Sequence, residues 1–222
     1  MARHDSAQRQ RILEAAVGVF ADHGLKGATT RLVGQAAGVN SALIYYYFED
    51  KETLFTEVIR LVLRDFLEHL GQGRRPFSDA RDRLGYLVDG IFSYYSSQPQ
   101  RLRLMPVILS LPPDRFGRTV SELLRETPLP APLAILAEGM AAGELRALPP
   151  LPAWWDILGL CLFNLHLNKI APHLQLPAPV RVPSATARRD AILDLLMAGL
   201  AGRGHRQAAK ASAKPAAQAG LP

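Results

Sequence analysis

The sequence is poor in cysteine, and its first third has no proline. Cys161 is the one cysteine in the 222 residues, so an internal disulfide is excluded and a reducing, cytoplasmic setting is expected. The 17 prolines all lie at Pro76 or beyond, which leaves the preceding residues free to be helical almost throughout. With 48% hydrophobic and 21% charged residues, the composition is that of a globular protein and excludes a disordered or collagenous chain.

Long apolar runs are also missing. The apolar stretch at 157–163 is far too short to cross a bilayer, which takes about 20 residues. The first apolar stretch, from Ile12 to Ala21, is interrupted by Glu14 and has the spacing of an amphipathic helix, not of a secretory leader. We therefore expect no membrane partner.

Excess charge of one sign is confined to the end of the chain. The net charge is +6, but Arg203, Arg206, Lys210 and Lys214 stand in an alanine-rich segment with no acid. The residues before this segment are nearly balanced in charge, so composition alone does not indicate a nucleic-acid partner. We expect residues 202–222 to be a disordered basic tail, either a solvated extension or a second DNA-binding arm.

Signatures of catalysis and metal binding are absent as well. The chain has no G-x-S-x-G, no phosphate-binding G-x-x-x-x-G-K-[ST], no dinucleotide-binding G-x-G-x-x-G and no H-E-x-x-H. His166 and His173 have no carboxylate or thiol at ligand spacing. We expect no catalytic residue, no metal and no cofactor, although a helical enzyme or small-molecule carrier that assembles its site from distant residues stays open as the alternative.

Helical spacing and helix punctuation run along the whole chain, which predicts an all-α fold. The first 75 residues predict a helix closed by His23-Gly24 and a short helix that begins after the capping residues Thr29-Thr30 and ends at Ala37-Gly38. They also predict a third helix through Tyr47, capped by Asn40 or Ser41, and a fourth from Asp50 to about Leu70. Beyond these, helices are predicted near 78–97, 100–111, 114–126, 131–142, 153–171 and 184–201, with Pro106 kinking or splitting the second of them.

The second and third predicted helices, separated by Gly38-Val39-Asn40, form a helix-turn-helix. Ile44 and Phe48 are four residues apart and are predicted to point into a small core, whereas Ser41, Ala42 and Tyr45 share another face with Tyr46 beside them. The small residues let the backbone approach base edges, and the tyrosines can reach phosphates or thymine methyl groups. Outside such a motif, three consecutive tyrosines would more simply be a partly buried aromatic ridge.

At these residues the chain resembles the TetR family of bacterial transcriptional regulators. The resemblance spans roughly residues 8–60 and combines the helix ending in Phe20-Ala21-Asp22-His23-Gly24, the threonine cap, the Ala-Gly-Val turn, the aromatic run and the lysine that opens the fourth helix. Two later stretches, 143–146 and 195–200, also look similar to the family.

The resemblance implies an all-helical homodimer whose N-terminal domains bind the halves of an inverted-repeat operator in double-stranded DNA. It also implies that a small molecule, bound by the C-terminal domain, releases the DNA. We expect a DNA-binding domain at 1–50 and a ligand-binding and dimerisation domain at 51–201; whether the protein represses or activates is open. By the resemblance, the phosphate contacts are Thr30, Tyr46, Tyr47 and Lys51. The base-facing positions are Arg31, Ser41, Ala42, Leu43 and Tyr45. Leu43 departs from the small or hydroxyl residue of many members and cannot hydrogen-bond to a base.

The C-terminal half is rich in aromatic and aliphatic side chains, so the effector is expected to be small and mainly apolar. The candidate ligand-binding residues are Phe92, Tyr95, Met105, Trp155, Phe163 and His166. The alternative for each is core or dimer packing, or a protein or water partner for His166. The helices near 153–171 and 184–201 are apolar around more than one side, and the candidates for their dimer face are Leu160, Phe163, Ile192, Leu196 and Leu200.

Overall fold

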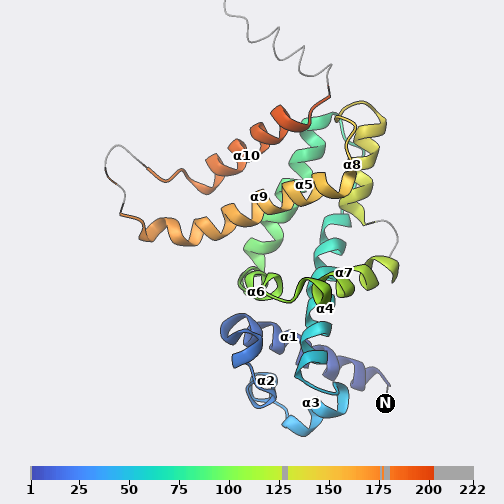
Figure 1. Ribbon diagram of the computed structural model, residues 1–222, viewed down its shortest axis with the longest axis vertical. Helices are drawn as coiled ribbons and strands as arrows, with labels where there is room; N and C mark the ends of the chain where they lie inside the picture. The colour runs from blue at the N-terminus through green and yellow to red at the C-terminus, as the bar shows by residue number, and fades with distance from the viewer. Residues whose placement is uncertain (1, 127–129, 176, 178–180, 203–222) are drawn as a thin grey trace, which may run out of the picture. The chain divides into compact units, whose positions relative to one another are not determined.

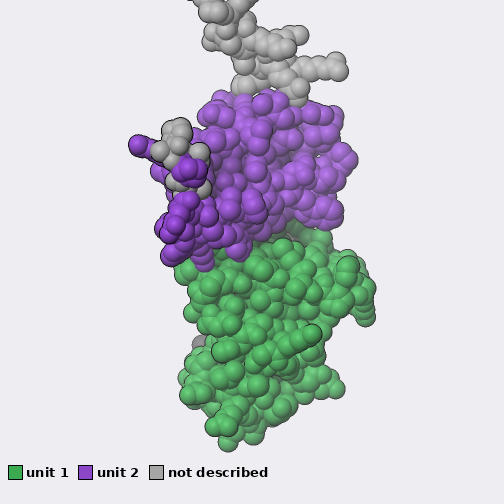
Figure 2. All heavy atoms as spheres, turned by 60° about the vertical axis from the view of Figure 1, so that its left-hand side comes forward, with its two compact units in different colours: residues 1–72, 93–130 green, residues 73–92, 131–222 purple. Residues whose placement is uncertain are grey.

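The computed structural model describes residues 2–126, 130–175, 177 and 181–202, and these ranges are helical with no strand. The all-α fold class is therefore confirmed (Figure 1). The chain divides into two compact units, residues 1–72 with 93–130 and residues 73–92 with 131–222, which are coloured separately in Figure 2. The predicted tail lies outside the described residues apart from Gly202.

The first unit holds the helices of the N-terminal third and two helices from the middle of the chain. They are α1 (Ala2–Gly27), α2 (Thr30–Ala37), α3 (Ser41–Tyr47), α4 (Lys51–Gly71), the end of α5 (Ala80–Ser97), α6 (Pro99–Leu109) and α7 (Pro113–Glu126). Helix α1 packs against α2, α4 and α6, and α4 packs against α7. The predicted apolar face of α1 packs into the core of the first unit. Its Phe20 has no exposed surface and meets the Phe55 ring edge-on, with 4.7 Å between the ring centroids.

Two details of this unit refine the sequence-based expectations. Gly24 interrupts α1 with φ 64°, at the glycine that was predicted to close the helix. The chain then makes a further helical turn that ends at Gly27. Pro106 does not split α6, which runs from Pro99 to Leu109. Proline costs the helix one backbone hydrogen bond, and the buried neighbours Met105 and Ile108 hold both sides of it against the core.

The second unit holds the start of α5 and the C-terminal helices. They are α8 (Ala131–Ala141), α9 (Pro150–Ile170), the single 3-10 turn η1 (Ala171–His173) and α10 (Ala185–Leu200). Helix α9 packs against α8 and α10. None of the described helices combines the length and apolar character required to cross a membrane.

The two later stretches singled out in the sequence lie side by side in this unit. The Arg146 amide donates to the Leu200 carbonyl at 2.9 Å, and the Gly202 amide donates to the Glu144 carbonyl at 2.8 Å. A Cβ at Gly202 would lie 2.3 Å from the Gly143 carbonyl oxygen, so a side chain there would push the two backbones apart. The end of α10 is thereby fastened to the segment that follows α8.

Candidate nucleic-acid interface

Caps and a left-handed glycine fix the turn between α2 and α3. Thr29 begins α2, its Oγ1 accepting a hydrogen bond from the Leu32 amide at 3.2 Å. Gly38 ends the helix with φ 64°, a conformation that glycine adopts without strain. The Val39 amide then donates to the Gly34 carbonyl at 2.8 Å, so the chain folds back on α2 before α3 begins.

Gly34 is a structural residue of this turn that we did not single out from the sequence. A Cβ on Gly34 would lie 2.8 Å from the Val39 carbonyl oxygen and 3.6 Å from the Ile44 Cδ1. Gly34 therefore sets how closely α2 approaches the turn. The signal was present, because a glycine inside an eight-residue helix weakens that helix and calls for a packing reason.

Helix α3 begins at a defined cap and buries the predicted side. Of the two predicted caps, Asn40 has this role, because its Oδ1 accepts from the Ala42 amide at 3.0 Å. Ile44 and Phe48 are 1% and 2% exposed, which confirms that they face the core. The Arg9 guanidinium lies over the Phe48 ring at 5.1 Å and closes that side of the domain.

The opposite side of α3 carries the residues expected to read DNA. Tyr45 and Tyr46 are 57% and 73% exposed, Ala42 is exposed and Ser41 is half-buried. Leu43 is also half-buried. The helix therefore presents small residues at its start and two tyrosine rings beyond them.

Thr30 and Lys51, two of the predicted phosphate-contacting residues, open the helices on either side of α3 in the sequence. Thr30 Oγ1 lies 3.3 Å from the Tyr45 hydroxyl, so the start of α2 and the exposed side of α3 touch. Lys51 opens α4 and its Nζ reaches the Lys26 carbonyl at the end of α1, 3.5 Å away. Arg31, which is predicted to face bases, is exposed on the first turn of α2. The structure thus brings Thr30 together with Tyr45.

Tyr47 has a hydrogen-bond partner that no sequence pattern predicts. Its hydroxyl donates to the Asp5 carboxylate from the first turns of α1. This hydrogen bond is the main reason that the pKa of Tyr47 is raised to about 12. The hydroxyl is therefore protonated at neutral pH and remains a donor.

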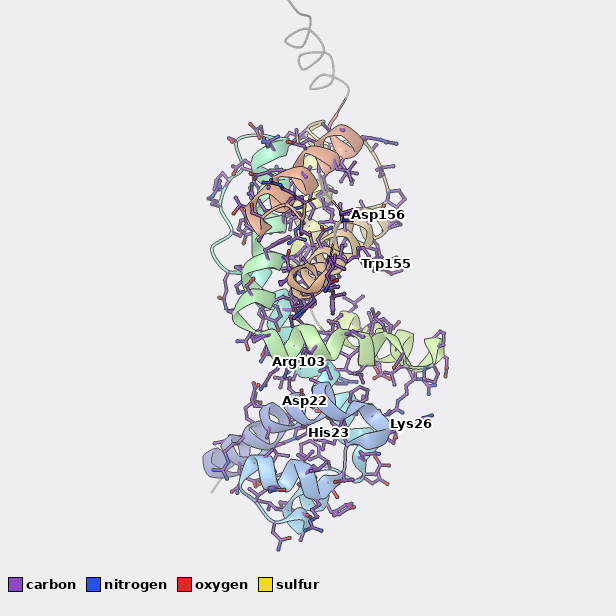
Figure 3. All side chains as sticks on the ribbon, turned by 90° about the vertical axis from the view of Figure 1, so that its left-hand side faces the viewer. Asp22, His23, Lys26, Arg103, Trp155 and Asp156 are labelled. Atoms are coloured by element: carbon purple, nitrogen blue, oxygen red, sulfur yellow. The ribbon has the colours of Figure 1, made fainter. Side chains whose placement is uncertain are left out.

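Two acids of α1 are paired with arginines of α6, away from α3. Asp22 accepts from Arg103 at 3.0 Å, a pair whose members are labelled in Figure 3. Glu14 accepts from Arg101 at 3.3 Å. The acidic and basic side chains of the N-terminal sequence are therefore not evenly distributed over its surface, because these two carboxylates are neutralised on the α6 side of α1.

Arg101 is a buried polar centre that sequence reasoning missed. Its guanidinium donates to the Tyr94 hydroxyl and to Asp65, both at 2.7 Å, besides Glu14. It thereby joins α1, α4, α5 and α6 while only 7% of its side chain is exposed. Tyr94 also donates to the Val62 carbonyl at 3.2 Å. No spacing in the sequence indicates this network, since its members come from four helices.

The six candidate ligand-binding residues are divided between the two units. Tyr95 and Met105 are buried in the first unit, whereas Phe92 and His166 are half-buried in the second. Trp155, labelled in Figure 3, and Phe163 are 62% and 65% exposed on α9.

His166 nevertheless keeps a feature of a ligand contact. Its Nδ1 lies 2.9 Å from the Leu162 carbonyl and so carries the proton. Its Nε2 is buried, with no hydrogen-bond partner within the described ranges, as is the Asn168 Oδ1. Both atoms are acceptors that lack a donor.

Other reactive groups of the second unit have no chemical role that the structure supports. Cys161 is buried, and burial raises the pKa of its thiol to about 12. No group of three His, Cys, Asp or Glu residues in the described part of the chain could hold a metal ion.

An apolar stripe runs along one side of α9. Leu151, Trp155, Phe163 and Ile170 are exposed at helical spacing, with the exposed Gly159 between them. Of the predicted dimer residues, Phe163 belongs to this stripe. Ile192 and Leu196, in contrast, are 4% and 6% exposed because they pack inside the subunit, and Leu160 and Leu200 are half-buried. On α10 the exposed apolar residue is Leu195.

Residues 12–58 match the family model described as bacterial regulatory proteins, tetR family. Among curated proteins, the chain is similar to the HTH-type transcriptional repressor NicS of Pseudomonas putida, with 33% identity over 97 residues, 44% of this chain and 46% of the repressor. The chain thus spans about half the length of the curated relatives it matches, and the family model falls on its N-terminal part.

Solved structures extend the likeness to nearly the whole fold. The transcriptional regulator SCO4942 of Streptomyces coelicolor has a TM-score of 0.63 and 26% identity, covering 87% of this chain and 98% of that one. The regulator FadR of Bacillus subtilis, solved in complex with stearoyl-CoA, has a TM-score of 0.69 and 21% identity, covering 86% and 98%. The FadR likeness shows the fold alone.

Proposed function

Since the chain belongs to the TetR family of bacterial regulatory proteins, we propose that it is a transcriptional repressor released from its operator by a small, mainly apolar molecule. The operator is an inverted repeat in double-stranded DNA, read by one α3 helix from each subunit of a homodimer. The family's regulators are DNA-binding proteins and not enzymes.

The observation that carries this proposal is the two-sided character of α3. Ile44 and Phe48 fasten the helix to the domain, while Tyr45 and Tyr46 remain exposed on the other side. A short helix with exposed tyrosines and small residues, braced by a preceding helix, suits entry into a major groove. Ser41, Ala42, Leu43, Tyr45 and Arg31 are proposed to face bases, and Thr30, Tyr46, Tyr47 and Lys51 to contact phosphates.

A gel-shift experiment with the DNA flanking the protein's own gene tests this function. A retarded band that survives excess unrelated DNA, and that is lost when the inverted repeat is scrambled, is expected. The variant Tyr46→Ala, matched by Leu109→Ala as an exposed large side chain on α6 that belongs to neither α3 nor the α9 stripe, locates the DNA-binding surface. Retention of specific binding by Tyr46→Ala, or equal losses in Tyr46→Ala and Leu109→Ala, would contradict the proposal.

The homodimer is proposed to form through the apolar stripe of α9, with Leu195 of α10 beside it. Two such helices from each subunit give a four-helix interface. Exposed rings of this size at helical spacing mark an interaction surface, and a second copy is the partner that an inverted-repeat operator requires. Sedimentation is expected to show a dimer at micromolar concentration, and a monomer there would contradict the interface.

The effector is proposed to be mainly apolar with at least one hydrogen-bond donor. Tyr95, Met105 and Phe92 are apolar candidates for its contacts, and a donor on the effector would satisfy the buried Nε2 of His166. Long-chain acyl compounds are the first class to test, because FadR was solved with stearoyl-CoA. To release DNA, the effector must favour one conformation over another by about 1 to 3 kcal/mol.

Release of the operator in a titration is the experiment that identifies the effector. Addition of an acyl compound is expected to raise the melting temperature and to dissociate the complex with DNA. His166→Phe keeps a ring of similar width and removes the acceptor, so it should weaken an effector that donates to Nε2 without altering operator binding. A response only to highly charged metabolites that carry no acyl chain would overturn the apolar assignment.

A further inference from the structure

The loop between α4 and α5 forms one side of an open hollow in the second unit. The volume of this hollow is about 520 Å³, which lies within the range of small-molecule sites. Its lining residues are Arg74, Arg75, Pro76, Phe77, Arg83 and Glu138. None of the six ligand candidates from the sequence is among them, so the hollow is separate from the proposed effector contacts.

The lining carries three guanidinium groups against one carboxylate. Arg75 and Arg83 pair with Asp82 and Glu144, which lie outside the lining, and Arg74 pairs with Glu138 inside it. The charges of this cluster are therefore balanced, but each guanidinium group has five N–H donors, more than these pairs use. Guanidinium groups fixed in place are the protein groups best suited to bind oxyanions.

Arg83 is held rigidly at the base of the hollow. Its Nε donates to Glu144 at 2.9 Å and its Nη1 to the Ile135 carbonyl at 3.1 Å, and the residue is 6% exposed. Its guanidinium lies 4.7 Å from the centre of the Phe77 ring. A Cβ at position 139 would lie 2.6 Å from the Arg83 Cδ, so Gly139 makes room for this side chain.

Arg75 is also held in place, by a bidentate contact with Asp82. Its Nη1 and Nη2 donate to the two carboxylate oxygens of Asp82 at 2.8 and 2.6 Å. Asp82 further accepts from the Ser78 amide at 3.0 Å. The hydrogen bond from Arg75, followed by that from the Ser78 amide, holds the pKa of the Asp82 carboxyl well below its usual range. The loop therefore holds Arg75 in position in the absence of a ligand.

Glu138 is the replaceable partner in the hollow. It accepts from Arg74 and lies 3.8 Å from the Arg83 Nη1, but 54% of its side chain is exposed. Exposed ion pairs contribute little to stability. An incoming anion can therefore take the place of Glu138 on Arg74 at small cost to the fold.

We propose that this arginine hollow is a binding site for a phosphoryl group, either as free phosphate or as the phosphate of a small metabolite. A phosphate monoester carries about 1.5 to 2 negative charges at neutral pH, so it can compete with the single charge of Glu138 for Arg74. Arg74 supplies a donor that changes partner from Glu138 to the ligand, and Arg83 and Arg75 supply guanidinium donors that are already fixed in place. This site is independent of the effector and of the operator.

Calorimetric titration of the full-length protein tests the site, with inorganic phosphate and glycerol 3-phosphate as probes at constant ionic strength. Saturable binding of at least one probe is expected. Binding of free phosphate alone, of the ester alone, or of both tells which source of the group the hollow accepts. Succinate is the comparison dianion, and tighter binding of succinate than of either probe would overturn the phosphoryl assignment.

Variants assign the binding to the hollow. Arg74→Gln removes an exposed donor and should weaken binding about tenfold or more, whereas Glu138→Gln removes the competing carboxylate and should tighten it. Arg81→Gln is the matched control, because Arg81 is an exposed arginine of the same unit, paired with Asp194, that does not line the hollow. Absence of saturable binding, or equal losses in Arg74→Gln and Arg81→Gln, would overturn the proposal.

Discussion

Helices α3 and α9 both leave large aromatic rings exposed, and they do so to similar extents. Tyr45 and Tyr46 are 57% and 73% exposed, and Trp155 and Phe163 are 62% and 65% exposed. Exposure therefore does not distinguish the two surfaces, but their chemistry does. The tyrosines carry hydroxyls that remain useful at a wet, charged surface, whereas the α9 stripe is almost entirely hydrocarbon and gains most from a dry contact.

The residues around the two helices differ in the same way as the rings themselves: they are polar or charged near α3 and apolar along α9. Thr30 contacts the Tyr45 hydroxyl, and the positively charged Arg31 and Lys51 lie in the first turns of the flanking helices α2 and α4. The stripe of α9 continues instead through Gly159 to Ile170. We infer that α3 is built to meet a phosphate backbone and base edges, and that α9 is built to meet another copy of itself.

The largest effect is expected from placing a charge in the α9 stripe. Phe163→Asp would bury an unpaired carboxylate from each subunit in the proposed interface, at a cost on the order of 4 kcal/mol, or about a thousandfold in the dimerisation constant. Sedimentation should show monomers. Tyr46→Asp, the same substitution on the other helix, should leave the dimer intact and abolish operator binding. If Tyr46→Asp alone dissociated the dimer, the two surfaces would have been assigned the wrong way round.

A smaller effect is expected from filling the space that Gly34 leaves open. Gly34→Ala should destabilise the protein by about 1 to 3 kcal/mol, because its Cβ would meet the Val39 carbonyl oxygen. Weaker operator binding with an unchanged dimer is expected, since the turn positions α3 and not α9. Gly117→Ala on α7 is the control, where a Cβ meets nothing within 4 Å and should be neutral or stabilising. Equal thermal unfolding of both variants would show that the turn tolerates the displacement.

A change in base preference is expected from the exposed side of α3. Tyr45→Ala should alter the preferred bases by about tenfold at one or two positions of each half-site, and Ser41→Ala should do so by less. Binding to the operator and to its single-base variants separates this result from a uniform loss. If Tyr45→Ala kept both affinity and base preference, the proposed recognition face would be wrong even though the fold is right.

The sequence was sufficient for features that depend on neighbouring residues. The start of α2 followed from the Thr29-Thr30 cap, and boundaries of later helices followed from proline clusters. The buried side of α3 followed from the spacing of Ile44 and Phe48. Arg101 shows what could not be predicted, because its partners lie 7 to 87 residues away.

The apolar helices show the second limit. In a helix that is apolar on several sides, spacing cannot tell which side meets the core. Ile192 and Leu196 were therefore assigned to the same dimer face as Phe163, although the first two pack inside the subunit and Phe163 does not.

The smallest effects concern Tyr47, whose hydroxyl already has a partner. A phosphate that accepts from Tyr47 must first displace Asp5, so Tyr47→Phe is expected to weaken binding only about two- to tenfold, and equally on every DNA sequence. Asp5→Asn removes both the competitor and a negative charge near the phosphate, so it should tighten binding several-fold. The gain should shrink when Tyr47 is already Phe, and a double-mutant cycle measures this difference.

A spectroscopic titration checks the premise of that cycle without DNA. The pKa of Tyr47 is raised to about 12 chiefly by its hydrogen bond to Asp5, so Asp5→Asn should lower it toward the ordinary value near 10. Because both pKa values lie well above neutral pH, both proteins keep Tyr47 protonated and able to donate at neutral pH. The change in operator affinity must then come from the lost competition and charge, not from ionisation of the tyrosine. A lowered pKa with unchanged affinity in both backgrounds would show that Asp5 and Tyr47 are paired in the free protein but that Tyr47 does not contact the operator.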